Sequence, residues 1–300
     1  MNPHPRIAVS SWSLHRKLGV TYTNGPGGSD TADAVETFGK AELALLELPA
    51  ALRAHGYGRI ELCHFHLARL DPVYIDEVRS AFADSNVVIQ TLLIDDGDIT
   101  NRTMRARDMA WINKWIGVAA RLGAIHARAI AGKQKPNAET LALSVSGLTH
   151  LANSAATQGV KLVTENWFEL TATPVEVHHI LNGVPGLGFL ADTGNWGGVT
   201  KHADLANIFA RAQLCHAKAQ FTGAVMNVKD YGACITAGEG PGYTGPYTLI
   251  FADDGDEWEG LAKERNVVVS QLATTPAAAA TTVTSDVTLG TRKSVPSWPL

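Results

Sequence analysis

The chain has 300 residues, enough for one large α/β barrel or for two smaller domains. Hydrophobic residues make up 45% and charged residues 18%, a composition that supports a packed core and excludes intrinsic disorder. Lysine and arginine number 25 against 29 aspartates and glutamates, and this net charge of -4 disfavours a nucleic-acid binder. The three cysteines are too few for a disulfide framework, and no signal peptide or membrane span is recognisable. We therefore expect a soluble cytoplasmic protein.

Short apolar segments alternate with longer amphipathic segments along the whole chain. The short segments are apolar on both faces, as is typical of parallel strands covered by helices. In chain order, the predicted strands are residues 7–11, 59–63, 87–94, 125–130, 161–165, 188–192, 212–218 and 248–251. The predicted helices between them are residues 34–55, 71–83, 103–122, 138–158, 174–181 and 203–210.

This alternation predicts a single (β/α)8 TIM barrel over residues 6–268. An open doubly wound sheet is the alternative, but the first strand is not followed by a Gly-x-Gly-x-x-Gly turn. The glycine-rich residues 24–28 lack the ending of a phosphate-binding loop, and we expect a surface loop or lid there. Residues 271–300, rich in alanine and threonine, are predicted to be an irregular tail, with an edge strand at 281–287 as the alternative.

Three consecutive predicted strands end with side chains that bind metals. Glu165 and Asp192 close their strands, and His216 lies near the end of the next one. The steps from 165 to 192 and from 192 to 216 each match one strand–helix repeat, so the three side chains occupy corresponding places at the C-terminal mouth. Carboxylates and an imidazole suit one Mn²⁺, Mg²⁺, Co²⁺ or Zn²⁺ ion. The alternatives are a turn cap for Asp192 and a core histidine for His216.

Other polar and aromatic side chains near strand ends are candidates for substrate binding. Lys218 follows His216 by two residues and therefore shares its side of the strand. Glu61, His64 and His66 are secondary candidates at the second strand. Alternation points His64 and His66 the same way, toward the mouth, and the alternative for either is a surface loop residue. Trp12 follows the first strand and either stacks on a sugar or packs in the core. Further candidates for binding sugar hydroxyls or a phosphate are Gln90, Arg128 and Lys133.

Four segments together resemble one protein family over residues 6–268. The family is the xylose-isomerase-like TIM barrel superfamily of sugar isomerases and epimerases, which also contains the family-two AP endonucleases. The resemblance rests on Glu165-Asn166, Asp192-Thr193-Gly194-Asn195, His216-Ala217-Lys218 and Gly242-Tyr243-Thr244-Gly245-Pro246.

The resemblance implies one divalent metal ion held by Glu, Asp, His and Glu on strands five to eight. The first three positions are Glu165, Asp192 and His216, but the fourth falls on Ile250, which cannot bind a metal. Asp253 and Asp254 lie at least three residues further on, about 10 Å along a strand.

The implied activity is that of a metal-assisted sugar or polyol isomerase or epimerase that removes a proton next to a carbonyl. Glu165 would be a ligand and base, Lys218 an oxyanion partner, and Asn195 a substrate contact beside Trp12, His64 and His66. A keto-sugar or cyclic polyol dehydratase shares the first step, and Ile250 slightly favours it; a barrel that binds without turnover is the third alternative. DNA repair is disfavoured, because Asn195 stands where a second-metal histidine would be expected.

The expected partner is a small carbohydrate, with neither nucleic acid nor a membrane involved. We expect the loops 21–33 and 221–242 to determine which sugar binds. The sequence leaves the identity of the sugar and the formation of a homo-oligomer open.

Overall fold

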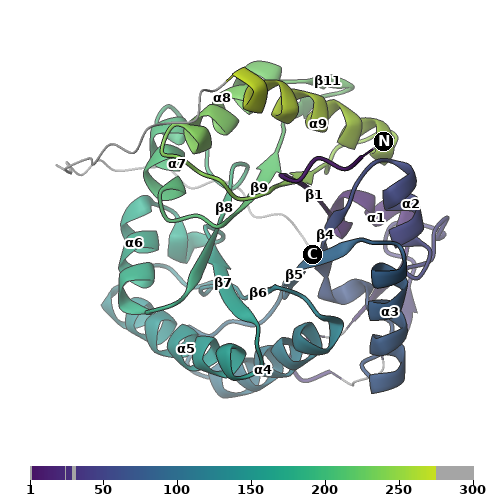
Figure 1. The fold of residues 1–300 in the computed structure, drawn as a ribbon. Helices are drawn as coiled ribbons and strands as arrows, with labels where there is room; N and C mark the ends of the chain where they lie inside the picture. The colour runs from purple at the N-terminus through teal and green to yellow at the C-terminus, as the bar shows by residue number, and fades with distance from the viewer. Residues whose placement is uncertain (1, 24, 29–31, 275–300) are drawn as a thin grey trace.

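Eight parallel strands close into a barrel in the computed structural model, which describes residues 2–23, 25–28 and 32–274 (Figure 1). Around the barrel the strands follow the order β1, β12, β9, β8, β7, β6, β5, β4, and β4 pairs with β1 to close the ring. They are β1 (Ile7–Ser10), β4 (Arg59–Cys63), β5 (Val88–Leu93), β6 (His126–Arg128), β7 (Lys161–Glu165), β8 (Gly188–Asp192), β9 (Leu214–Lys218) and β12 (Tyr247–Ile250). The prediction of a (β/α)8 barrel is confirmed.

Helices surround the barrel and cover the outer face of its strands (Figure 1). They are α1 (His15–Leu18), α2 (Leu48–Ala54), α3 (Pro72–Asp84), α4 (Arg105–Leu122), α5 (Ala138–Thr157), α6 (Pro174–Gly183), α7 (Lys201–Phe209), α8 (Val228–Glu239) and α9 (Glu257–Thr274). Local sequence fixes several helix starts: Asp71 and Thr173 cap helices that begin with proline, and Asn137 forms a capping box with Thr140. No helix within the described ranges is both long and apolar enough to cross a membrane.

The core has two parts that together position the mouth of the barrel. A large apolar cluster fills the space between the strands and the helices. A smaller cluster inside the barrel consists of Cys63, Leu93, Val163, Leu190 and Leu214. Three of these residues precede Glu165, Asp192 and His216 by two positions, so the same alternation directs the polar side chains inward, one layer nearer the C-terminal ends.

The predicted helix over residues 34–55 is wrong for most of its length. Ala34–Val35 forms the strand β3, which pairs with β2 (Thr21–Tyr22), and the helix begins only at Leu48. Gly39 adopts a φ of 97°, which is incompatible with a helix, and Pro49 lies in the first helical turn, where its missing N–H costs nothing.

Two further segments differ from the sequence-based expectation. The segment expected to be the loop 221–242 contains the hairpin β10 (Phe221–Thr222) and β11 (Val225–Met226), followed by α8. Helix α9 continues through Thr274, because its packing against α8 and β12 extends it into the predicted tail. The remainder of the tail, including 281–287, lies outside the described residues, as does part of the glycine-rich segment 24–28.

Candidate metal and active site

Glu165, Asp192 and His216 converge at the C-terminal mouth of the barrel. All three side chains are buried, and each offers a ligand atom within 4.8 Å of the others. Nδ1 of His216 lies 3.4 Å from Oδ2 of Asp192 and 3.5 Å from Oε1 of Glu165. Neighbouring ligands on one Mg²⁺ ion are about 3 Å apart, as bonds of about 2.1 Å at right angles require. The donor set therefore fits a single divalent cation, and the role of the three residues as ligands stays a prediction.

Glu61 on β4 orients the ring of His216 from across the barrel. Its Oε2 lies 2.6 Å from Nε2 of His216, and its Oε1 accepts a hydrogen bond of 2.8 Å from Thr91. Burial would lower the pKa of His216, but the charges of Glu165 and Glu61 raise it well above the ordinary value. Because Nε2 faces Glu61, Nδ1 is the atom presented to the other two carboxylates. The sequence indicated Glu61 as a secondary candidate on the second predicted strand, but it did not indicate the contact with His216.

The carboxylate of Asp192 caps a turn with one oxygen and leaves the other free of that turn, so the turn cap and the predicted ligand role are compatible. Its Oδ1 accepts hydrogen bonds from the backbone N–H groups of Gly194 and Asn195, at 2.5 and 2.9 Å, and so caps the turn. Its Oδ2 faces His216. Burial would raise the pKa of Asp192, but the hydrogen bond and charge of His216 lower it below the ordinary value. The side chain of Asn166 braces the backbone of Asp192 through bonds of 2.7 and 3.0 Å.

Glu165 is held from both sides. Asn195 donates a hydrogen bond of 3.0 Å to Oε1, and Nε of Arg128 lies 3.1 Å from Oε2. Arg128 also pairs with Asp95, and its guanidinium lies over the ring of Trp167. Burial would raise the pKa of Asp95, but the charge of Arg128 lowers it to about 2. Asp95 was missed by sequence analysis, although it follows a predicted apolar strand as directly as any carboxylate considered.

The three additional candidates for sugar or phosphate contacts are all engaged by other protein groups. Arg128 pairs with Asp95 and Glu165, as described, and Lys133 forms an ion pair of 2.7 Å with Asp96. The side chain of Gln90 accepts a hydrogen bond from Arg59 and contacts His126. Arg128 and Gln90 are buried, where a cation or an amide is stable only with partners, so the structure shows both as parts of the scaffold. Lys133 is only half-buried, and its ion pair lies near the surface.

Lys218 lies at the rim of the site, beside the position where a fourth ligand was expected. It ends β9, and its register partner on β12 is Ile250. Tyr247 and Leu249 belong to the outer core, so alternation directs Ile250 into the barrel. The stem of Lys218 crosses Gly194 so closely that a Cβ there would lie 2.5 Å from the lysine Cδ. Glycine at this position is therefore a steric requirement for the placement of Lys218.

Trp12 stands in an aromatic group after the first strand. It belongs to the 3-10 helix η1 (Ser11–Leu14), stacks on His15 with ring centroids 4.8 Å apart, and meets Phe38 and Phe65 edge-on. Trp12 and Phe65 both pack on the inner apolar cluster. Trp12 is only half-buried, so part of the indole remains exposed for a ligand.

The expectation that His64 and His66 point the same way is wrong. Both lie in the 3-10 helix η2 (His64–His66), where residues two apart face different directions. Nδ1 of His64 accepts a hydrogen bond of 3.2 Å from the N–H of Asp95, whereas Nδ1 of His66 lies 2.9 Å from Oγ of Ser11. Burial lowers the pKa of His66 to about 3. Each imidazole therefore connects the loop after β4 to a different neighbouring strand.

The barrel and its mouth define the class of protein. A family model described as xylose isomerase-like TIM barrel matches residues 49–264, and the chain belongs to this family. The expected resemblance is confirmed.

Solved structures with the same fold include several epimerases. A xylose isomerase-like TIM barrel protein from Mycobacterium smegmatis in complex with magnesium has 17% identity and a TM-score of 0.66, over 91% of this chain and 99% of that chain. An L-ribulose 3-epimerase has 16% identity and a TM-score of 0.66, over 91% and 96%. A D-allulose 3-epimerase from Methylomonas sp. in complex with D-allulose has 17% identity and a TM-score of 0.62, over 90% and 99%. A search of curated protein sequences finds no match.

Proposed function

We propose that the chain is a sugar isomerase or epimerase that works with one divalent metal ion at the mouth of its barrel. The observation that carries this proposal is the convergence of Glu165, Asp192 and His216 within 4.8 Å of one another, with Lys218 at the rim. Epimerases among the solved structures of the same fold support the reaction class, and the magnesium complex supports a divalent ion. The two carboxylates suit Mg²⁺ and Mn²⁺, and the imidazole suits Co²⁺ and Zn²⁺, so the mixed donor set leaves the metal open among these four ions.

In the proposed reaction, different residues of the chain have different roles in removing the proton next to the carbonyl. When bound, the metal ion would polarise the sugar oxygens and stabilise the negative charge that develops on them. Glu165 takes the proton, because Arg128 and Asn195 hold its carboxylate in one place. Lys218 contributes positive charge at the rim, where a sugar oxyanion would lie. Glu61 fixes the ring of His216, so that Nδ1 faces the metal position.

The substrate is a small carbohydrate, for which the aromatic group at the mouth offers a stacking surface. The exposed part of Trp12 provides an apolar face, and the amide of Asn195 adjoins the carboxylate that takes the proton. We assign His64 and His66 to holding the loop after β4, because both rings are buried against protein groups.

A dehydratase or lyase is the second candidate, and Ile250 is the observation that favours it. An epimerase returns a proton to the opposite face of the carbon, a step for which a second carboxylate is the usual donor in this family. The inward position on β12 is occupied by Ile250, with Lys218 beside it. Elimination needs one base only, since the second step expels a hydroxyl group. Lys218, the register partner of Ile250, can carry a proton beside that position.

Solvent deuterium exchange tests both candidates without knowledge of the product. The purified chain is loaded with Mn²⁺ and incubated in D₂O with ketoses that include D-allulose and L-ribulose, and NMR follows the carbon-bound protons next to the carbonyl. We expect exchange in the wild type and at least a 100-fold slower rate in Glu165→Gln. The matched control Glu169→Gln alters an exposed carboxylate four residues away and should exchange normally. Loss of water from the sugar would identify the lyase, and metal binding without any exchange would contradict both candidates.

A further inference from the structure

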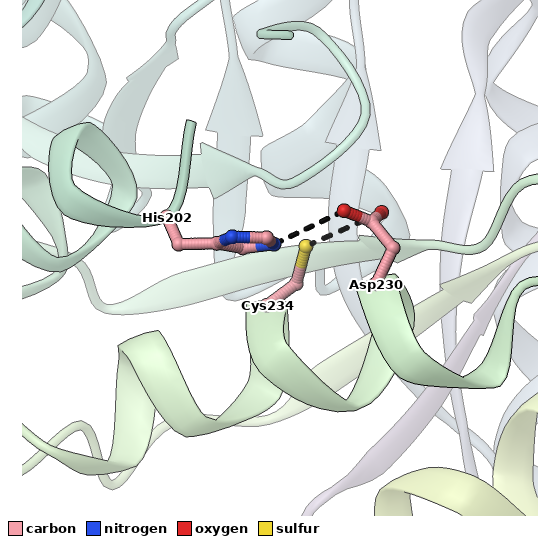
Figure 2. A group of neighbouring side chains, drawn as sticks. All are labelled: His202, Asp230 and Cys234. Carbon is pink, nitrogen blue, oxygen red and sulfur yellow. Dashed lines mark hydrogen bonds and ion pairs between the residues drawn. The ribbon is translucent and has the colours of Figure 1, made fainter. Parts of the chain in front are cut away.

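A second group of metal-ligating side chains lies in the helical layer, outside the barrel wall (Figure 2). His202 comes from the first turn of α7, and Asp230 and Cys234 come from one face of α8, one turn apart. Figure 2 shows the three side chains pointing toward one another across the gap between the two helices. They share no residue with the site at the mouth, and the proposed function does not use them.

The distances within this group suit a small tetrahedral ion. Nε2 of His202 lies 3.0 Å from Oδ1 of Asp230, and Sγ of Cys234 lies 3.9 Å from Oδ2 of the same residue. All three ligand atoms lie within 4.8 Å of one another. Ligands around Zn²⁺ are about 3.3–3.5 Å apart, as bonds of about 2.0 Å to nitrogen and oxygen and about 2.3 Å to sulfur require. Small changes in side-chain torsion angles would bring the three ligand atoms to these separations.

The chemistry of the three donors is selective. Imidazole, carboxylate and thiolate together favour Zn²⁺ or Co²⁺ over Mg²⁺, which binds oxygen ligands almost exclusively. The side chain of His202 is 44% exposed, so an ion can enter from solvent and keep a water molecule as fourth ligand. We propose that His202, Asp230 and Cys234 form a second metal site, which binds Zn²⁺ and joins α7 to α8.

Two features of the surroundings limit the affinity of this site. The ammonium of Lys201 lies 2.7 Å from Oδ2 of Asp230, and its positive charge opposes a cation while its hydrogen bond holds the carboxylate in position. The thiol of Cys234 must also lose its proton to solvent before its sulfur binds a metal. The site is therefore expected to exchange its metal readily, unlike a closed four-ligand zinc site.

Cobalt absorption tests the proposal, because a thiolate ligand gives Co²⁺ an intense charge-transfer band in the near ultraviolet. The three proposed ligands at the barrel mouth offer only oxygen and nitrogen donors, so a band that depends on Cys234 reports on the second site. We expect the band on titration of the full chain with Co²⁺, its loss in Cys234→Ser, and its retention in Cys215→Ser and Asp192→Asn. A titration without the band, or a band that survives in Cys234→Ser, would overturn the proposal.

Zinc affinity provides an independent measurement that does not alter the buried thiol. In the Asp192→Asn background, which weakens the mouth site, we expect His202→Ala to reduce Zn²⁺ affinity at least tenfold, about 1.4 kcal/mol, in competition with a chromophoric chelator. The matched control is His178→Ala on α6, a histidine that is also partly exposed and hydrogen-bonded to one side-chain oxygen, Oδ1 of Asn207. Equal Zn²⁺ affinities for His202→Ala and His178→Ala would refute the site.

Discussion

Replacement of Glu61 by glutamine should weaken metal binding at the mouth without changing any proposed metal ligand. The carboxylate of Glu61 lies 2.6 Å from Nε2 of His216, a charge-assisted contact. Such hydrogen bonds contribute about 1.5–3 kcal/mol, and neutral ones about 0.5–1.5 kcal/mol. Glutamine keeps one acceptor oxygen for Nε2 of His216, presents an N–H donor to the hydroxyl of Thr91 and loses the charge, so the difference at His216 is about 1–1.5 kcal/mol. This energy corresponds to an approximately tenfold weaker affinity of His216 and its neighbours for the metal.

Calorimetric titration with Mn²⁺ measures this effect directly. Glu77→Gln, which alters an exposed carboxylate on α3, is the matched control and should bind Mn²⁺ as the wild type does. Circular dichroism and urea unfolding establish that Glu61→Gln remains folded, since the residue is completely buried. If folded Glu61→Gln binds Mn²⁺ with unchanged affinity, then Glu61 does not orient the ring of His216, and the arrangement inferred for the site is incorrect.

Two further predictions concern single buried positions. Ile250→Glu places a fourth candidate ligand, a carboxylate, at the inward end of β12 beside Lys218, and should tighten Mn²⁺ binding at least tenfold by calorimetry. Unchanged affinity in the folded variant would show that position 250 does not reach the metal. Burial raises the pKa of Glu264 well above its ordinary value. Above about pH 4.3 the unfolded state therefore loses this proton while the folded state keeps it. The free energy of unfolding then falls as pH rises, by at most about 1.4 kcal/mol per pH unit. Glu264→Gln should therefore be more stable than wild type to urea at pH 8 and equally stable at pH 4, whereas a stability difference independent of pH would contradict this reasoning.

The sequence by itself determined the barrel and the strands that end at its mouth. Buried parallel strands are apolar on both faces, so a polar residue at the end of one is conspicuous, and Glu165, Asp192 and His216 were found in this way. The repeat length of one strand and one helix placed them at corresponding positions, because each unit of a barrel is built alike. The fourth ligand position at Ile250 came from the resemblance to the family and not from spacing, and it stays a prediction.

Two predictions from local sequence patterns were wrong: the helix over residues 34–55, and the strand geometry assumed for His64 and His66. Residues 34–55 contain enough apolar side chains for a helix, but the φ of Gly39 and the position of Pro49 determine where the helix begins. The histidines at 64 and 66 were assigned by strand alternation, and a 3-10 turn gave them different directions. In both cases the backbone conformation, which depends on tertiary packing, decided which way the side chains point.

Only the tertiary structure decided how the charges of the site are paired. Glu61 and His216 are 155 residues apart, and closure of the barrel brings β4 and β9 to opposite sides of one narrow interior. Barrel closure likewise brings Arg128 to Glu165 and Asp95, although the sequence indicated Arg128 as a candidate for binding sugar hydroxyls or a phosphate. A buried charge is stable only with partners, and spacing along the chain does not identify those partners, because the curvature of the closed sheet determines which side chains meet.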